Sequence, residues 1–225
     1  MTTFPILLDH AGVAVFAASG ALTAARKRLD IVGFCLVATV TGIGGGTLRD
    51  LLLGSLPVYW VQVPSYALLC LAVAVIVFFA EPPLESRLRV LLWADALGLA
   101  LFSVTGAERA LQAGAPVLVA VLMGVITAAF GGIIRDVVCA ELPLILRKEI
   151  YVTAAAAGAL VCALLATAGA SAAVAETAAF AVAFGARAVG LAFGLSLPAA
   201  PSPITTNRAS RTCPEQQASF NVSHT

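Results

Sequence analysis

Two apolar stretches of the sequence each contain a run of glycines followed three residues later by an Arg-Asp pair. The first stretch reads TGIGGGTLRD and the second reads AAFGGIIRD. Consecutive glycines weaken a helix, because each costs about 1 kcal/mol relative to alanine. Backbone carbonyls that are freed at such a point within a membrane need a partner other than lipid. The two stretches therefore predict helices that kink or break near the midplane and present carbonyl oxygens suited to a cation. Alternatively, the glycines only allow close packing between helices.

The two glycine stretches belong to a longer internal repeat with a spacing of 86 residues, which relates Asp9 to Asp95. Other residues at matching positions are Ser19 and Thr105, Thr41 and Thr127, Gly45 and Gly131, Gly46 and Gly132, Arg49 and Arg135, and Asp50 and Asp136. Charged residues are rare within apolar spans, so the Asp and Arg matches are the informative ones. The repeat predicts that its two copies place these groups in equivalent positions.

The composition excludes a water-soluble protein. Hydrophobic residues make up 60% of the chain and charged residues 11%, with a mean hydropathy of +1.00, whereas soluble domains carry about 25% charged residues. A net charge of +1 offers no electrostatic basis for binding nucleic acid. The sequence shows no metal-ligand spacing, phosphate-binding loop or Ser-His-Asp set, so we expect no enzyme, cofactor or metal site. It predicts an all-α integral membrane protein.

Seven stretches are long and apolar enough to cross a bilayer, which takes about 20 residues. They are 5–24, 31–55, 62–80, 88–107, 116–140, 150–169 and 173–197. Each copy of the repeat contains three stretches, and because three is odd, the second copy must enter the membrane from the opposite side. We expect two inverted three-helix repeats at 1–84 and 85–170, a seventh transmembrane helix at 171–197 and a flexible cytoplasmic tail at 198–225.

The basic residues predict the orientation, because Lys and Arg are enriched in cytoplasmic loops. With the N-terminus outside, the outer loops contain only Arg109. The inner loops then contain Arg26, Lys27, Arg28, Arg87, Arg89, Arg147, Lys148, Arg208 and Arg211. The sequence therefore predicts an outer N-terminus and a cytoplasmic C-terminus.

The intramembrane charges should pair across helices, because a lone charge at this depth costs at least a few kcal/mol. Neighbouring side chains on a helix diverge by about 100°, so we expect Arg49 to pair with Asp9 and Arg135 with Asp95. The remaining Asp of each set would face a hydrated path, and a net charge of −1 per set would favour cations. Alternatively, all these groups form closed ion pairs that only fix helix packing.

The residues that could line or gate such a path share a position near the glycine runs or a polar side chain within a span. They are Gly44, Gly45, Gly46, Gly131, Gly132, Asp50, Asp136, Thr41, Thr127, Ser19 and Thr105. Hydroxyl groups more often bond to their own helix carbonyls, so Ser and Thr rank second. Arg187, in the seventh stretch, has no repeat partner, and it could snorkel, neutralise an Asp or contact a lipid headgroup.

The paired motifs TGIGGGTLRDLLLG and AAFGGIIRDVVCAELP resemble the prokaryotic branch of the TRIC (trimeric intracellular cation) channel family, also known as glycine-transporter-like membrane proteins. The resemblance extends over residues 5–197. It implies a homotrimer in a bacterial inner (plasma) membrane, with a pore in each subunit between spans 2 and 5, which are kinked at their glycines. It also implies conduction of monovalent cations, chiefly potassium with some sodium. Phe130 replaces a third glycine in the second copy, so its kink should be less flexible.

Two functions of other classes remain open from the sequence. A secondary transporter of a small amino acid such as glycine would also use inverted repeats and broken helices. A non-conducting membrane assembly protein would use the charges only to lock its packing.

Overall fold

Helices account for all the regular secondary structure in the described part of the chain, which comprises residues 3–80, 84–146 and 151–194 of a computed structural model. The expected tail at 198–225 and the basic residues at 147, 148, 208 and 211 lie outside these ranges. The helices are α1 (Thr3–Arg26), α2 (Ile31–Leu53), α3 (Tyr59–Gln62), α4 (Ser65–Ala80), α5 (Leu84–Gln112), α6 (Val117–Val138), the 3-10 helix η1 (Leu144–Leu146), α7 (Val152–Thr167) and α8 (Ala172–Phe193). The protein is an all-α membrane protein, as its composition predicts.

Seven of these helices coincide with the seven expected stretches. Five of them, α1, α2, α5, α6 and α8, are long and apolar enough to span a membrane. Helices α4 and α7 have 16 residues each, or about 24 Å at 1.5 Å per residue, which is shorter than a hydrocarbon core of about 30 Å. The largest difference is at α5, which continues to Gln112 through residues that we expected to form a connection.

Local sequence explains where α2 begins and ends. The side chain of Asp30 caps its N-terminus by accepting a hydrogen bond from the backbone N of Gly33, which satisfies one of the first free amides. Gly54 ends the helix in the left-handed conformation at φ 68°, where a residue without Cβ is strongly favoured. The glycines inside the helix have a different role.

The glycine runs do not interrupt their helices. Helix α2 is continuous through Gly44–Gly46, and α6 is continuous through Gly131 and Gly132. The expected break near the midplane is therefore wrong, and a kink in the continuous helix stays a prediction. Helix propensity describes an isolated segment, and here tertiary packing offsets the cost of the glycines.

The glycines instead let α2 and α6 cross with their backbones in contact. A Cβ on Gly45 would collide with the carbonyl oxygen of Thr127, and a Cβ on Gly131 would collide with that of Thr41. The two contacts exchange equivalent positions of the repeat, so the crossing is pseudo-symmetric. Small residues at helix crossings are typical of membrane proteins, where close packing replaces the hydrophobic driving force.

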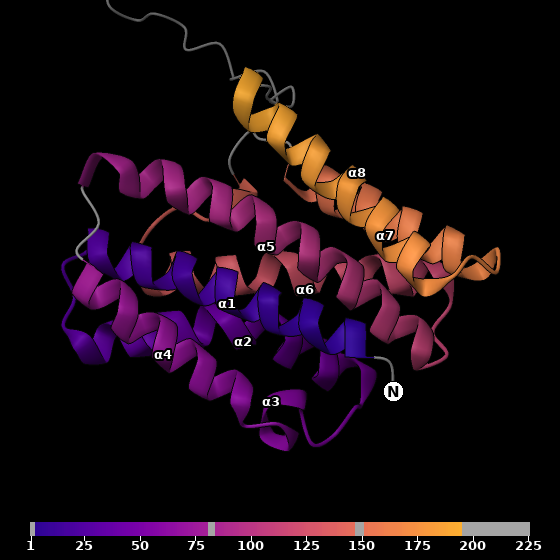
Figure 1. The fold of residues 1–225 in the computed structure, drawn as a ribbon, viewed down its shortest axis with the longest axis horizontal. Coiled ribbons are helices and arrows are strands. Elements are labelled where there is room, and N and C mark those ends of the chain that lie inside the picture. Colours follow the sequence, from indigo (N-terminus) through magenta and orange to yellow (C-terminus); the bar gives the residue numbers. More distant parts are fainter. Residues whose placement is uncertain (1–2, 81–83, 147–150, 195–225) are drawn as a thin grey trace, which may run out of the picture.

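Helices α1 and α5 lie at the centre of the molecule and are the most buried of the long helices. They lie side by side and run in opposite directions, as the inverted repeat predicts (Figure 1). The rings of Phe16 and Phe102, which occupy matching positions, stack with centroids 5.1 Å apart. Each ring also covers the glycine of the other helix, because Gly12 faces Phe102 and Gly98 faces Phe16.

Three helices pack on one another in each half of the molecule. Helices α1, α2 and α4 form one mutually contacting set, and α5, α6 and α7 form the other. Helix α8 packs against α5 and α7 at the edge (Figure 1). This arrangement places the C-terminal halves of α2 and α6, which contain the Arg-Asp pairs, in matching environments.

Candidate functional site

Two buried groups of charged residues follow the glycine runs. The first cluster consists of Asp9, Arg49, Asp50 and Arg109, and the second cluster consists of Asp95, Arg135, Asp136 and Arg187. The side chains come from α1, α2 and α5 in the first cluster and from α5, α6 and α8 in the second. Every member except Arg109 is buried.

In the first cluster, the expected pair of Arg49 with Asp9 is wrong. Arg49 binds its own neighbour, with Nη2 2.7 Å and Nε 2.9 Å from Oδ1 of Asp50. Asp9 is paired with Nη2 of Arg109, near the end of α5. The Arg side chain is long enough to reach the carboxylate of the adjacent residue, even though the Cα–Cβ bonds of neighbouring residues on a helix point in different directions.

In the second cluster, the structure brings Arg135 and Asp95 together. Nη1 of Arg135 lies 2.9 Å from Oδ1 of Asp95, and Nε lies 2.7 Å from Oδ1 of Asp136. Nη1 also donates to the hydroxyl of Ser19 on α1. Arg135 therefore joins α1, α5 and α6, whereas the only described carboxylate paired with Arg49 is that of its own neighbour, Asp50.

Arg187 belongs to the second cluster rather than to the membrane surface. Its side chain is 0% exposed, which excludes snorkelling. The guanidinium lies 5.2 Å from the ring centroid of Tyr151, within the range of a cation–π contact, and it interacts electrostatically with Asp95. Of the roles open from the sequence, neutralising an Asp is the one that this position fits.

The Asp residues expected to face a hydrated path are buried and occupied. Oδ2 of Asp50 accepts a hydrogen bond from the backbone N of Tyr59 at 2.8 Å, and Oδ2 of Asp136 accepts one from Leu144 at 3.0 Å. The other oxygen of each binds Arg. With exposures of 5% and 4%, the two carboxylates hold the segment after each helix, and in this conformation they do not face solvent.

The net charge of −1 expected for each set stays a prediction, because further charged groups lie beside both clusters. Arg109 adds a positive charge to the first cluster, and Arg187 adds one to the second. Each cluster thus contains two Arg and two Asp. Glu108 also interacts electrostatically with Asp9. The added Arg side chains suit the burial of the carboxylates, because an unmatched charge would carry a large desolvation cost.

The hydroxyl groups have three different environments. Those of Thr41 and Thr127 donate to carbonyls of their own helices, at Val37 and Met123, as the general behaviour of such groups predicts. The hydroxyl of Ser19 accepts from Arg135. Thr105, its repeat partner, has a buried hydroxyl without a hydrogen-bond partner.

Two tyrosines complete the clusters and were not identified from the sequence. The ring centroid of Tyr59 lies 5.5 Å from the guanidinium of Arg49, as Tyr151 lies beside Arg187. A Cβ on Gly46 would meet the ring of Tyr59, and one on Gly132 would lie 3.3 Å from the hydroxyl of Tyr151. The last glycine of each run therefore makes room for a tyrosine. The 86-residue spacing could not reveal this pairing, because the two tyrosines do not match in the repeat.

The arrangement is a tight helix crossing between two buried ionic clusters. At the level of Gly45 and Gly131, backbone contact leaves no space for an ion between α2 and α6. Within the described ranges, no three His, Cys, Asp or Glu side chains are grouped so that they could hold a metal ion. The feature that the geometry establishes at this point is a close contact between the backbones of α2 and α6.

Relatives of known sequence match most of the chain. The model of a family described as glycine transporter matches residues 6–82 and 92–167. The inner membrane protein YadS of Escherichia coli K12 is 43% identical over 155 residues, which cover 68% of this chain and 75% of YadS. A membrane protein of Vibrio cholerae is 42% identical over 158 residues, which cover 70% of this chain and 66% of the relative.

Solved structures match the fold. A TRIC trimeric intracellular cation channel orthologue from Rhodobacter sphaeroides is 55% identical, with a TM-score of 0.84, over 86% of this chain and 100% of the other. A prokaryotic TRIC channel crystallised in 0.5 M KCl is 29% identical, with a TM-score of 0.81, over 88% of this chain and 100% of the other.

Proposed function

Because this chain belongs to the TRIC family, we propose that it is a passive channel for monovalent cations in a bacterial inner membrane. The observation that carries the proposal is the likeness to solved TRIC cation channels over most of the chain, at an identity that reaches 55%. The long apolar helices are consistent with it. Potassium as the main ion, with some sodium, is part of the proposal.

The gate that we propose is the crossing of α2 and α6. Gly44, Gly45 and Gly46 of α2 and Gly131 and Gly132 of α6 would allow the two helices to slide or separate within each subunit. In the described conformation their contact is closed. Separation would free the carbonyl oxygens of Thr41 and Thr127, which pack on the opposite glycines, to face a passing cation. The ionic clusters on either side would hold the helix ends in place.

A matched pair of glycine substitutions tests the gate. Gly45→Ala inserts a methyl group against the carbonyl of Thr127, whereas Gly185→Ala in α8 meets no atom within 4 Å. We expect purified wild-type protein in planar bilayers to conduct potassium without saturation. Gly45→Ala should change the open probability by roughly tenfold, which corresponds to about 1.4 kcal/mol, and Gly185→Ala should leave it unchanged. Equal currents from the two variants would show that the crossing of α2 and α6 is not the gate.

The second candidate is a secondary transporter of a small amino acid, favoured by the description of the matching family model as a glycine transporter. Uptake of labelled glycine into proteoliposomes separates the two functions. A transporter should show saturable flux that depends on substrate, with no cation current in its absence. A protein with neither flux nor current would be the non-conducting assembly protein.

We also infer a homotrimer, with a pore in each subunit, surrounded by membrane lipid. Native mass spectrometry from detergent should give a mass of three chains. Reporter fusions should place the C-terminus in the cytoplasm and the N-terminus outside, as the distribution of basic residues predicts. If the protein is a monomer and conducts in bilayers, the channel function would be supported and the homotrimer would be contradicted.

A further inference from the structure

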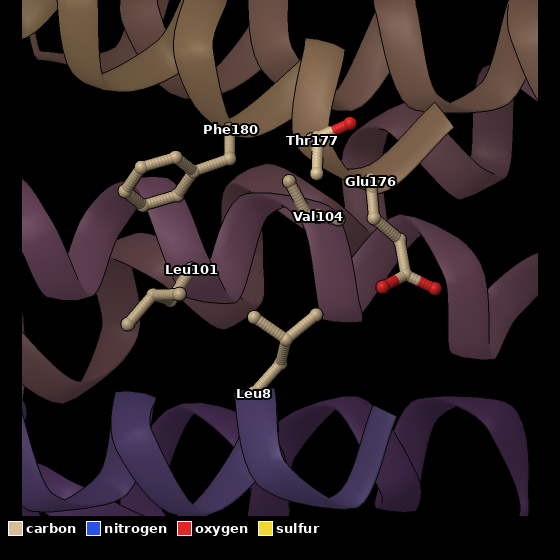
Figure 2. Close-up of a pocket in the computed structure, with 6 residues that line it drawn as sticks. All are labelled: Leu8, Leu101, Val104, Glu176, Thr177 and Phe180. Atoms are coloured by element: carbon tan, nitrogen blue, oxygen red, sulfur yellow. The ribbon is translucent and has the colours of Figure 1, made fainter. Parts of the chain in front are cut away.

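An unpaired acidic side chain lies where α1, α5 and α8 meet. Glu176 of α8 is 3% exposed, and neither of its carboxylate oxygens has a hydrogen-bond partner in the described structure. Its carboxylate extends from α8 towards α1, from which Leu8 points back (Figure 2). It borders a cavity of about 180 Å³ whose other walls are Leu8, Leu101, Val104, Thr177 and Phe180.

A second cavity adjoins the same carboxylate. It has a volume of about 320 Å³, and its polar lining includes Glu176, Glu108 and Gln112. The carboxylate of Glu108 accepts one hydrogen bond from Gln112 at 2.8 Å. Neither Glu forms any of the ion pairs found among the described residues, and the neighbouring Arg109 is occupied by Asp9. Buried Glu176 and half-buried Glu108 thus border the same partly open pocket, and every nearby cation found among the described residues is already paired.

The residues that line the cavity limit the kinds of ligand that could pair with the carboxylate of Glu176. An ionised carboxylate is costly in apolar surroundings unless it is paired. A bare metal cation takes several oxygen ligands, but the hydroxyl of Thr177 is already bonded to the carbonyl of Ala173 at 2.6 Å. The remaining walls are hydrocarbon. A cation that brings its own apolar body fits such a site better than a bare ion.

We propose that Glu176 and the adjoining apolar cavity bind a small organic ammonium ion. The ammonium group would donate hydrogen bonds to Glu176, and the negative charge of Glu108 would add to its attraction. The hydrocarbon body would lie between Leu101 and Val104 and against the ring of Phe180. The cavity is similar in size to an engineered cavity of about 150 Å³ that accepts benzene, so a single ring fits. This site is separate from the proposed gate and does not depend on conduction.

Benzylammonium and its neutral analogue benzyl alcohol test the proposal. Calorimetric titration of the full-length protein in detergent should show benzylammonium binding ~tenfold more tightly than benzyl alcohol, a difference of about 1.4 kcal/mol. Glu176→Gln should abolish that difference while keeping the affinity for benzyl alcohol. Equal affinities of the two ligands for the wild type, or no heat from benzylammonium at millimolar concentration, would overturn the proposal.

Three further variants keep the test decisive if Glu176→Gln does not fold. Leu101→Phe fills the cavity but retains the carboxylate, so it should weaken both ligands. Glu108→Gln should weaken benzylammonium alone. Glu141→Gln removes a carboxylate that pairs with Arg26 and Lys27 elsewhere in the molecule and should change neither affinity. Benzylammonium binding that survives both Glu176→Gln and Leu101→Phe would place the ligand elsewhere.

Discussion

At the scale of single residues, equivalent arginines of the repeat have different partners. Arg135 binds Asp95, Asp136 and Ser19, whereas Arg49 pairs with Asp50 alone among the carboxylates of the described residues. In the first cluster, Arg109 takes the place beside Asp9 that the repeat assigns to Arg49. An inverted repeat therefore determines which charged groups lie near each other. Which groups form ion pairs within each cluster depends on the lengths and positions of the individual side chains.

The burial of the second cluster predicts a large effect of removing its central cation. Arg135→Met would leave Asp95 and Asp136 as buried carboxylates without their partner, and breaking a buried pair in this way costs about 3–5 kcal/mol. Lys27→Met removes one of two cations that pair with Glu141 and a side chain that is 35% exposed, and pairs open to solvent contribute about 1 kcal/mol or less. Thermal unfolding followed by circular dichroism in detergent should show the much larger decrease for Arg135→Met. Similar decreases would mean that the second cluster is hydrated.

The repeat partners Ser19 and Thr105 predict opposite responses to losing a hydroxyl. Ser19→Ala removes an acceptor of Arg135 and should lower the free energy of unfolding by about 1–3 kcal/mol. Thr105→Val keeps the shape and removes a hydroxyl that has no partner, so it should leave stability unchanged or raise it. The same unfolding measurement ranks the two variants. A large loss from Thr105→Val would show that this hydroxyl bonds to ordered water.

At the scale of helices, the glycine runs show how tertiary packing overrides local propensity. Consecutive glycines predict a weak point, yet α2 and α6 continue through them. The contacts explain why, because Gly45 and Gly131 face carbonyl groups, while Gly46 and Gly132 face tyrosines. The absence of a side chain at these glycines lets a carbonyl group or a tyrosine ring of another segment come close. Their backbone flexibility becomes relevant only when α2 and α6 move relative to each other.

The crossing predicts a difference in stability between two Gly→Ala substitutions. Gly45→Ala should destabilise the protein by about 1–3 kcal/mol or more, because overpacking forces the backbones apart. Gly185→Ala lies in open space on α8 and should stabilise it by about 0.5–1 kcal/mol through helix propensity. Melting temperatures of the two variants in the same detergent give the comparison. Equal shifts would contradict the close contact of α2 and α6.

At the scale of the whole molecule, the two halves meet across a pseudo-symmetric centre. Phe16 of α1 and Phe102 of α5 stack on each other, and each covers a glycine of the opposite helix. The clusters lie around this centre without sharing its symmetry, since Arg187 comes from α8 and has no counterpart in the first half. The eighth helix thus makes the two sides of the molecule chemically distinct.

Equivalent surroundings predict equivalent losses at the centre. Phe16→Ala and Phe102→Ala should each lower the free energy of unfolding by about 3–5 kcal/mol. The double variant should lose less than the sum, because both substitutions remove the same stacking contact. Chemical unfolding in mixed micelles measures all three. Strict additivity would show that the rings do not interact.

The sequence by itself determined the class, the helix positions, the repeat and the family. Hydropathy and residue spacing are properties of the sequence, so they do not depend on how the helices pack. They located the two glycine runs and predicted the pair of Arg135 with Asp95, although the same spacing also predicted a pair of Arg49 with Asp9 that the structure does not form.

Only the tertiary structure decided how the polar groups are satisfied. Arg49 had two carboxylates within plausible reach, and the choice of Asp50 over Asp9 depends on the competing position of Arg109 at the end of a longer α5. One carboxylate oxygen of Asp136 is satisfied by the backbone N of Leu144. Glu176 has no hydrogen-bond partner among the described residues, because the described cations lie too far from its carboxylate. Distances of a few ångströms between helices set these outcomes, and residue order along the chain does not encode such distances.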